Sequence, residues 1–157
     1  MKIHRLLPLA LALVFIPVSG LRAEAAKPAE KAEKPEKPET ELEQVMGRMG
    51  KAWRQVRKAA RDGKLTPATA DLVATVRTNA EAAAKLTPAL EAEKPAADRA
   101  KFQADYVTQM KKLTAALTTL EAALKANETA KATQLVGDIG NLMKSGHHDF
   151  RKPEERH

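Results

Sequence analysis

The chain has 157 residues and a formal net charge of +7 at pH 7, with no cysteine and only 3% aromatic residues. Without cysteine it has neither disulfides nor thiolate metal sites. The few scattered aromatic residues argue against a stacking platform for nucleic acid, and we see no nucleophile–base pair, paired carboxylates or phosphate loop that would indicate an enzyme.

Residues 1–25 have the features of a secretory signal. Lys2 and Arg5 give a basic start, residues 6–18 form an apolar run broken by two prolines, and small residues precede a cleavage point near Ala25. The apolar run is short for a membrane span, and no later segment approaches the roughly 20 apolar residues that a span requires. We expect export to a bacterial periplasm, with no integral membrane segment once the signal is removed.

Residues 26–39 are a low-complexity mixture of Ala, Lys, Pro and Glu without apolar periodicity. Such a segment cannot bury a face and is expected to be a disordered linker. The remaining residues, 40–152, are enough for one compact domain.

The first predicted helix begins at a capping box, in which Thr40 and Glu43 satisfy each other's free backbone amides. Asp62-Gly63 is expected to end this helix. Apolar residues between these signals recur every three or four positions and predict one buried stripe: Leu42, Val45, Met46, Met49, Trp53, Val56 and Ala60.

The second predicted helix has Thr66 as its N-cap and Pro67 at its first helical position. Its stripe is richer in alanine, and the two prolines of residues 87–95 indicate a loop after it. The stripe consists of Leu72, Val73, Val76, Ala80, Ala83 and Leu86.

The third predicted helix is the longest and runs to Lys125 with a regular alternation of four and three residues between apolar positions. Asn127-Glu128 is expected to cap a fourth helix, which Pro153 ends. The apolar face of the fourth helix is expected to contain Leu135, Val136, Ile139, Leu142, Met143, His147 and Phe150.

Four amphipathic helices with short connections and no strand signal predict an all-α fold, an antiparallel up-down-up-down four-helix bundle. We expect a monomer or weak dimer. In this topology the start of the first helix and the end of the fourth lie at the same end of the bundle. Met46 lies six residues after Thr40, about 9 Å along the helix, and His147 is close to the other helix's end, so the two could face each other.

The C-terminal motif resembles a known haem-attachment motif. Residues 143–151 are similar to the Cys-x-x-Cys-His-x-x-Phe-Arg tail of cytochromes c-prime, with Met143 and Gly146 in place of the cysteines and His147 in place of the axial ligand. Residues 41–46, Glu-Leu-Glu-Gln-Val-Met, resemble the opening motif of the cytochrome b-562 family, which ends in a methionine ligand.

The resemblance to the cytochrome b-562 family implies haem b held without a covalent bond, with Met46 and His147 as axial ligands of the iron. It also implies that Phe102 and Tyr106 line the haem pocket, and Arg151 is a candidate to reach a propionate. The implied function is that of a periplasmic single-electron carrier and not an enzyme, with an unknown redox partner.

Other interpretations remain open at this point. Met46 could be a core methionine, with Met49 as the ligand one turn later, and His147 could be a partly exposed residue without a ligand role. The alternative function is a haem-free exported bundle that binds a protein partner or a metal. Basic and acidic residues look interspersed, which favours an ordinary solvated surface over a docking site for an acidic redox partner.

Overall fold

The computed structural model describes residues 39–152, and these residues contain four α-helices and no strand. The predicted all-α four-helix bundle is therefore confirmed, whereas the predicted signal, residues 26–38 of the linker and Pro153 lie outside the described residues. The helices are α1 (Glu41–Arg61), α2 (Thr69–Ala83), α3 (Ala96–Lys125) and α4 (Thr129–Phe150), and a short 3₁₀ helix, η1 (Ala89–Glu93), precedes α3.

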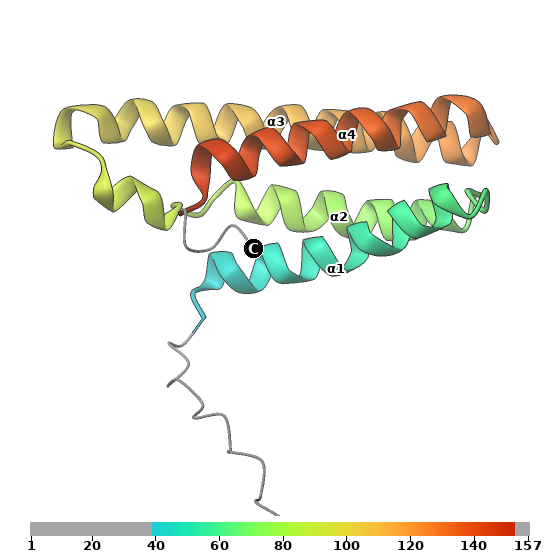
Figure 1. The fold of residues 1–157 in the computed structure, drawn as a ribbon, viewed down its shortest axis with the longest axis horizontal. Coiled ribbons are helices and arrows are strands. Elements are labelled where there is room, and N and C mark those ends of the chain that lie inside the picture. Colours follow the sequence, from blue (N-terminus) through green and yellow to red (C-terminus); the bar gives the residue numbers. More distant parts are fainter. Residues whose placement is uncertain (1–38, 153–157) are drawn as a thin grey trace, which may run out of the picture. The chain divides into compact units, whose positions relative to one another are not determined.

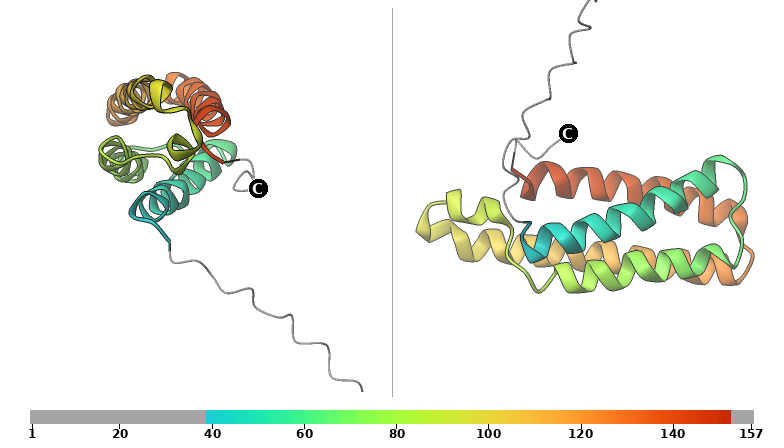
Figure 2. Two further views of the ribbon diagram at one scale, coloured as in Figure 1. Left: turned by 90° about the vertical axis from the view of Figure 1, so that its left-hand side faces the viewer. Right: turned by 90° about the horizontal axis from the view of Figure 1, so that it is seen from below.

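Consecutive helices run in opposite directions along the bundle (Figure 1). Each helix packs against the next one in the chain, and α4 returns to lie beside α1, as the end-on view in Figure 2 shows. The start of α1 and the end of α4 are consequently at the same end of the molecule. The pair α1 and α4 has the loosest packing of the four neighbouring pairs.

The core is formed by one face of each helix. Its most deeply buried side chains are large aliphatic residues, and burial of each contributes about 1.5–3 kcal/mol relative to an exposed side chain. They are Val56 of α1, Val73 and Val76 of α2, Leu117 and Leu120 of α3, and Ile139 of α4. Among residues 39–152 no helix is both long enough and apolar enough to cross a membrane.

Both predicted ends of α1 are confirmed. The amide of Thr40 donates to the Glu43 carboxylate at 2.6 Å, and the amide of Glu43 donates to Thr40 Oγ1 at 3.2 Å, which completes the capping box. At the other end Gly63 has a φ of 65°, a left-handed conformation that glycine adopts without steric cost. The amide of Lys64 then donates to the Ala59 carbonyl at 2.8 Å and closes the helix.

The predicted start of α2 is wrong. The helix begins at Thr69, and the Thr66 side chain does not cap it. Instead the amides of Thr69 and Ala70 donate to carbonyls three residues earlier, so that a tight turn through Pro67 precedes the regular helix. Thr69 Oγ1 accepts from the Thr66 amide at 3.2 Å, the reverse of the expected cap.

The expected N-cap position of α4 is confirmed at Glu128, but neither Asn127 nor Glu128 caps the helix with a side-chain hydrogen bond. Asn127 has a φ of 56° and ends α3 instead, with the amide of Glu128 bonded to the Ala123 carbonyl at 2.9 Å. The Glu128 carboxylate pairs with Lys131 at 2.7 Å. The residues 87–95 that were expected to form a plain loop contain η1.

Candidate functional site

Met46 lies in the second turn of α1, partly buried against the core. Arg48 Nε donates to Asn79 Oδ1 of α2 at 3.2 Å, which identifies the flank of α1 that faces α2. Positions two residues apart differ by about 160° around a helix. Met46 is therefore on the other flank, toward α4. Met49, by contrast, is only 3% exposed within the core, so Met46 is the more accessible thioether.

His147 lies in the last turn of α4, next to the contact between α4 and α3. Gly146 faces Gln109 of α3, whose Cγ would be 3.6 Å from an added Cβ, and Gln109 Nε2 donates to the Leu142 carbonyl at 3.1 Å. His147 is about 100° from Gly146, on the far side of buried Met143. It therefore lies on the flank of α4 that faces α1.

His147 was expected on the buried face of α4, but it is exposed. It is only about 40° around the helix from Met143, which is 9% exposed. A side chain so close to the core is normally covered by the neighbouring helix. The exposure of His147 results from the loose packing of α1 against α4, and it leaves an inward-facing imidazole accessible at the bundle end.

The environment of His147 favours its neutral form. Desolvation lowers the pKa of the imidazole below its ordinary value of 6.5, and the positive charge of Arg151 lowers it further. A neutral imidazole has a nitrogen lone pair available for a metal. His148 instead lies on the polar side, as expected, with its side chain 78% exposed and Nδ1 2.9 Å from Asp149.

Gly146 and Gly140 lie on different flanks of α4, and their surroundings differ. The close approach of Gln109 accounts for Gly146 as a helix–helix contact. Gly140, on the α1 side two turns before His147, would meet no atom within 4 Å if it had a Cβ. On α1, a Cβ added to Gly50 would lie 3.7 Å from Nη1 of Arg54, a side chain of the same helix.

An aromatic cluster holds the last turn of α4 against α3. The Phe150 ring lies 5.3 Å from Phe102 and 5.5 Å from Tyr106, measured between ring centroids. Tyr106 is buried, its hydroxyl donates to the Ala83 carbonyl at 2.9 Å, and burial raises its pKa to about 12, so it stays neutral. Phe150 was predicted only as a core residue; its signal as a site residue was its position three residues after His147.

Arg151 follows directly after α4 and is partly buried. Its amide donates to the His147 carbonyl at 3.3 Å. The next residue, Lys152, pairs with Glu93 of η1 at 2.6 Å. This ion pair fixes the chain just beyond the candidate ligand.

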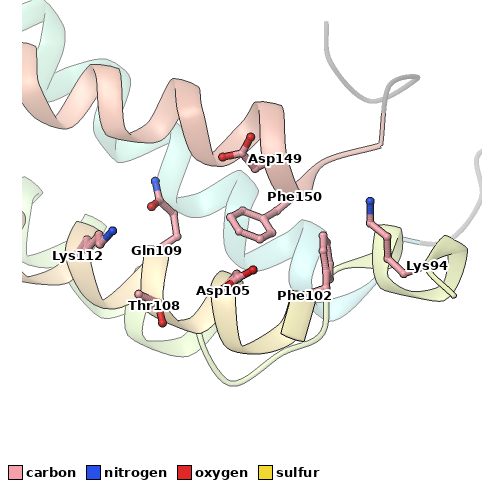
Figure 3. Close-up of a pocket in the computed structure, with 8 residues that line it drawn as sticks. All are labelled: Lys94, Phe102, Asp105, Thr108, Gln109, Lys112, Asp149 and Phe150. Atoms are coloured by element: carbon pink, nitrogen blue, oxygen red, sulfur yellow. The ribbon is translucent and has the colours of Figure 1, made fainter. Parts of the chain in front are cut away.

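A separate surface hollow of about 420 Å³ lies on the α3 side of α4 (Figure 3). Of the predicted site residues it includes only Phe102. The structure thus places the hollow and the candidate ligands on different flanks of α4. The residues that line it are Lys94, Phe102, Asp105, Thr108, Gln109, Lys112, Asp149 and Phe150.

The sequence profile of cytochrome b562 matches residues 41–151, nearly the entire bundle. The chain belongs to the cytochrome b562 family. No curated protein and no solved structure matches it. Members of the cytochrome b562 family are haem-binding, electron-carrying bundles that hold haem b without covalent attachment.

The residues of this cytochrome b562 family member fit haem b. Met46 and His147 would supply one thioether and one imidazole to an iron held at this end of the bundle. They lie at the same end of the bundle, on flanks of α1 and α4 that face each other. Within residues 39–152 no group of three or more His, Cys, Asp or Glu side chains is placed to hold a separate metal ion.

Proposed function

We propose that this protein is a periplasmic single-electron carrier that binds haem b between α1 and α4, with Met46 and His147 as the axial ligands. The observation that carries the proposal is the exposed His147 in the last turn of α4, at the same end of the bundle as Met46 in the second turn of α1. Membership of the cytochrome b562 family supports the same cofactor.

Haem bound at this site supplies a one-electron iron couple. The Met46 thioether favours the reduced state, and the neutral His147 can ligate without first losing a proton. With both residues bound to the iron, no position would remain for a substrate. This arrangement favours electron transfer over catalysis.

The remaining site residues have supporting roles in the proposal. Phe102, Tyr106 and Phe150 form the aromatic cluster that holds the last turn of α4, and with it His147, against α3. Arg151 supplies a positive charge beside His147 and would hold a carboxylate of the cofactor.

The direct test is a haem titration of the purified protein, followed by the visible spectrum. We expect one haem per chain with a low-spin, six-coordinate spectrum, and acid–acetone should extract the haem because no cysteine can attach it. A protein that stays colourless after titration would instead support the haem-free bundle that binds a partner.

The choice of Met46 over Met49 has its own test. Met46→Ala should give a five-coordinate, higher-spin iron and a lower reduction potential, since the thioether donor is lost. Met49→Ala removes a core side chain, so it should lower stability but keep the low-spin spectrum. The opposite pair of results would place the ligand one turn later on α1.

Export is the part of the proposal that depends on residues 1–25. In a bacterial host the protein should be recovered from the periplasmic fraction, with a mature chain that begins near Ala26. Recovery of the uncleaved chain from the cytoplasm would contradict this localisation without affecting the haem test.

A further inference from the structure

The positive charge of the described residues is concentrated on α1 and the turn after it, contrary to the interspersed pattern that we expected. Residues 48–64 contain seven basic residues and one acidic residue, a net charge of +6. The other described residues contain twelve basic and thirteen acidic residues, a net charge of −1. One segment of 17 residues therefore accounts for the positive charge of residues 39–152.

All seven basic side chains of this segment belong to exposed residues. Five of them lie within about 120° around α1, on the side opposite buried Val56. We name these five residues the α1 basic face: Lys51, Arg54, Arg57, Lys58 and Arg61. From Lys51 to Arg61 the face extends for about 15 Å along the helix.

Within residues 39–152 few acidic side chains neutralise the cations of the α1 basic face. Lys58 pairs with Asp62 at 2.5 Å, and no ion pair is found for Lys51, Arg54, Arg57 or Arg61 among the described residues. Between α2 and α3 the pattern differs, since Arg77 of α2 pairs with both Glu81 and Glu121. Clustered like charges that lack counter-charges repel one another, and binding of an anionic partner would offset this repulsion.

The chemistry of the face distinguishes between anionic partners. Trp53 and Val56, the large apolar residues of this part of α1, are buried in the core. The face therefore presents neither an apolar anchor for insertion into a bilayer nor an aromatic ring for base stacking. Three of its five cations are arginines, whose planar guanidinium pairs with a carboxylate through two parallel hydrogen bonds.

We propose that the α1 basic face is a docking surface for an acidic protein. The complementary charges of the two surfaces steer the encounter and fix its orientation. The surface is defined by charge and exposure alone, so it does not require haem. If the protein is an electron carrier as proposed above, the acidic protein is its redox partner, because the face begins little more than one turn after Met46.

The test uses the full-length mature protein and a peptide of ten glutamates as the acidic probe, with binding followed by NMR. We expect amide shift changes concentrated on residues 48–64. The triple variant Arg54→Glu, Arg57→Glu, Arg61→Glu should weaken binding by about tenfold or more. Raising the salt from about 0.01 to 0.1 M should also weaken it, because the screening length falls from about 30 to 10 Å.

The matched control reverses three exposed lysines outside α1, Lys85→Glu, Lys111→Glu and Lys144→Glu, for the same change in net charge. Binding should fall much less in the control than in the α1 variant. An equal loss in both variants, or no binding by the wild type, would overturn the proposal. Circular dichroism of both variants checks that the helices remain folded.

Two further probes test the assignment to a protein partner. Vesicles of phosphatidylglycerol and phosphatidylcholine in equal parts, and a 20-nucleotide oligo(dT), should bind more weakly than the peptide at 0.1 M salt. Tighter binding to the vesicles that depends on Arg54, Arg57 and Arg61 would show that the face serves a membrane surface and would overturn the acidic-protein assignment. Tighter binding to the oligonucleotide would overturn it in the same way.

Discussion

The two long sides of this bundle differ in how they are held together. Between α2 and α3 the core includes fully buried aliphatic residues from both helices, and Glu121 of α3 accepts hydrogen bonds from Arg77 of α2 and from Lys125. Between α4 and α1 the packing is loose, and His147 remains exposed although it faces inward. The difference indicates that the α2–α3 side contributes more to stability than the α4–α1 side, where the haem site is proposed.

The largest expected effect is on the α2–α3 side. Leu117→Ala removes a side chain that is fully buried, so the free energy of unfolding should fall by about 2–5 kcal/mol. Leu42→Ala, a partly buried residue of α1 near the candidate site, should cost about 1 kcal/mol or less. Urea unfolding of both variants in the absence of haem measures the two losses in the free energy of unfolding. Equal losses would show that stability is shared evenly between the two sides.

The next effect is on the α1–α4 side. His147→Ala should weaken haem binding by about tenfold or more and abolish the low-spin spectrum, while the stability of the haem-free protein should change by less than about 0.5 kcal/mol because the residue is exposed. His148→Ala, whose side chain points to solvent, is the control and should alter neither property. An unchanged spectrum in His147→Ala would remove the basis for this site.

A smaller expected effect is a pH dependence of stability on the α2–α3 side, which arises from Glu121. The hydrogen bond from Lys125, and then that from Arg77, holds the pKa of Glu121 below its ordinary value of 4.5, although burial acts in the opposite direction. A lowered folded-state pKa stabilises the protein above pH 4.5, and this stabilisation is lost as the pH falls through the folded-state value.

Thermal unfolding of Glu121→Gln should therefore give a lower Tm than the wild type at pH 7, and this difference should be smaller at an acid pH, where Glu121 becomes protonated in the folded wild type. Asp138→Asn is the control, because Asp138 is exposed and has no ion pair among the described residues. A difference that is the same at both pH values would mean that the Glu121 charge is not responsible.

The smallest expected effect is on the pKa of His147. In the haem-free protein, NMR titration should place its pKa below 6.5, mainly because of desolvation. Arg151→Gln removes a positive charge and should raise this pKa slightly, whereas Arg99→Gln, on α3, should not change it. A titration of His147 at or above 6.5 in the wild type would contradict the partly desolvated environment.

The helices could be predicted from the sequence because their signals are local. The Thr40 capping box, Gly63 and the regular apolar spacing of α3 are each complete within a few residues. The turns were harder, since Thr66 and Asn127 are both good N-cap residues by type. Their actual roles depend on the tight turn at Pro67 and on the left-handed conformation that ends α3.

The candidate site could be predicted only in part. Its two ligand positions follow from helix periodicity and the family motifs, but the exposure of His147 depends on the spacing of two helices that are far apart in sequence. The role of Gln109 was missed altogether, because nothing in the sequence around it indicates a bond to the Leu142 carbonyl. The concentration of charge on α1 could have been found in the sequence, because residues 48–64 contain seven basic residues and one acidic residue.

The capping box at the start of α1 has a consequence for the proposed ligand. Helix ends undergo local opening at little free-energy cost, and Met46 is only one turn beyond the amides that Thr40 and Glu43 protect. When the first turn frays, the thioether loses its fixed position, and the iron would exchange one defined ligand for a population of open states. If Met46 is the ligand as proposed, these two exposed hydrogen bonds would set how rigidly its thioether is held.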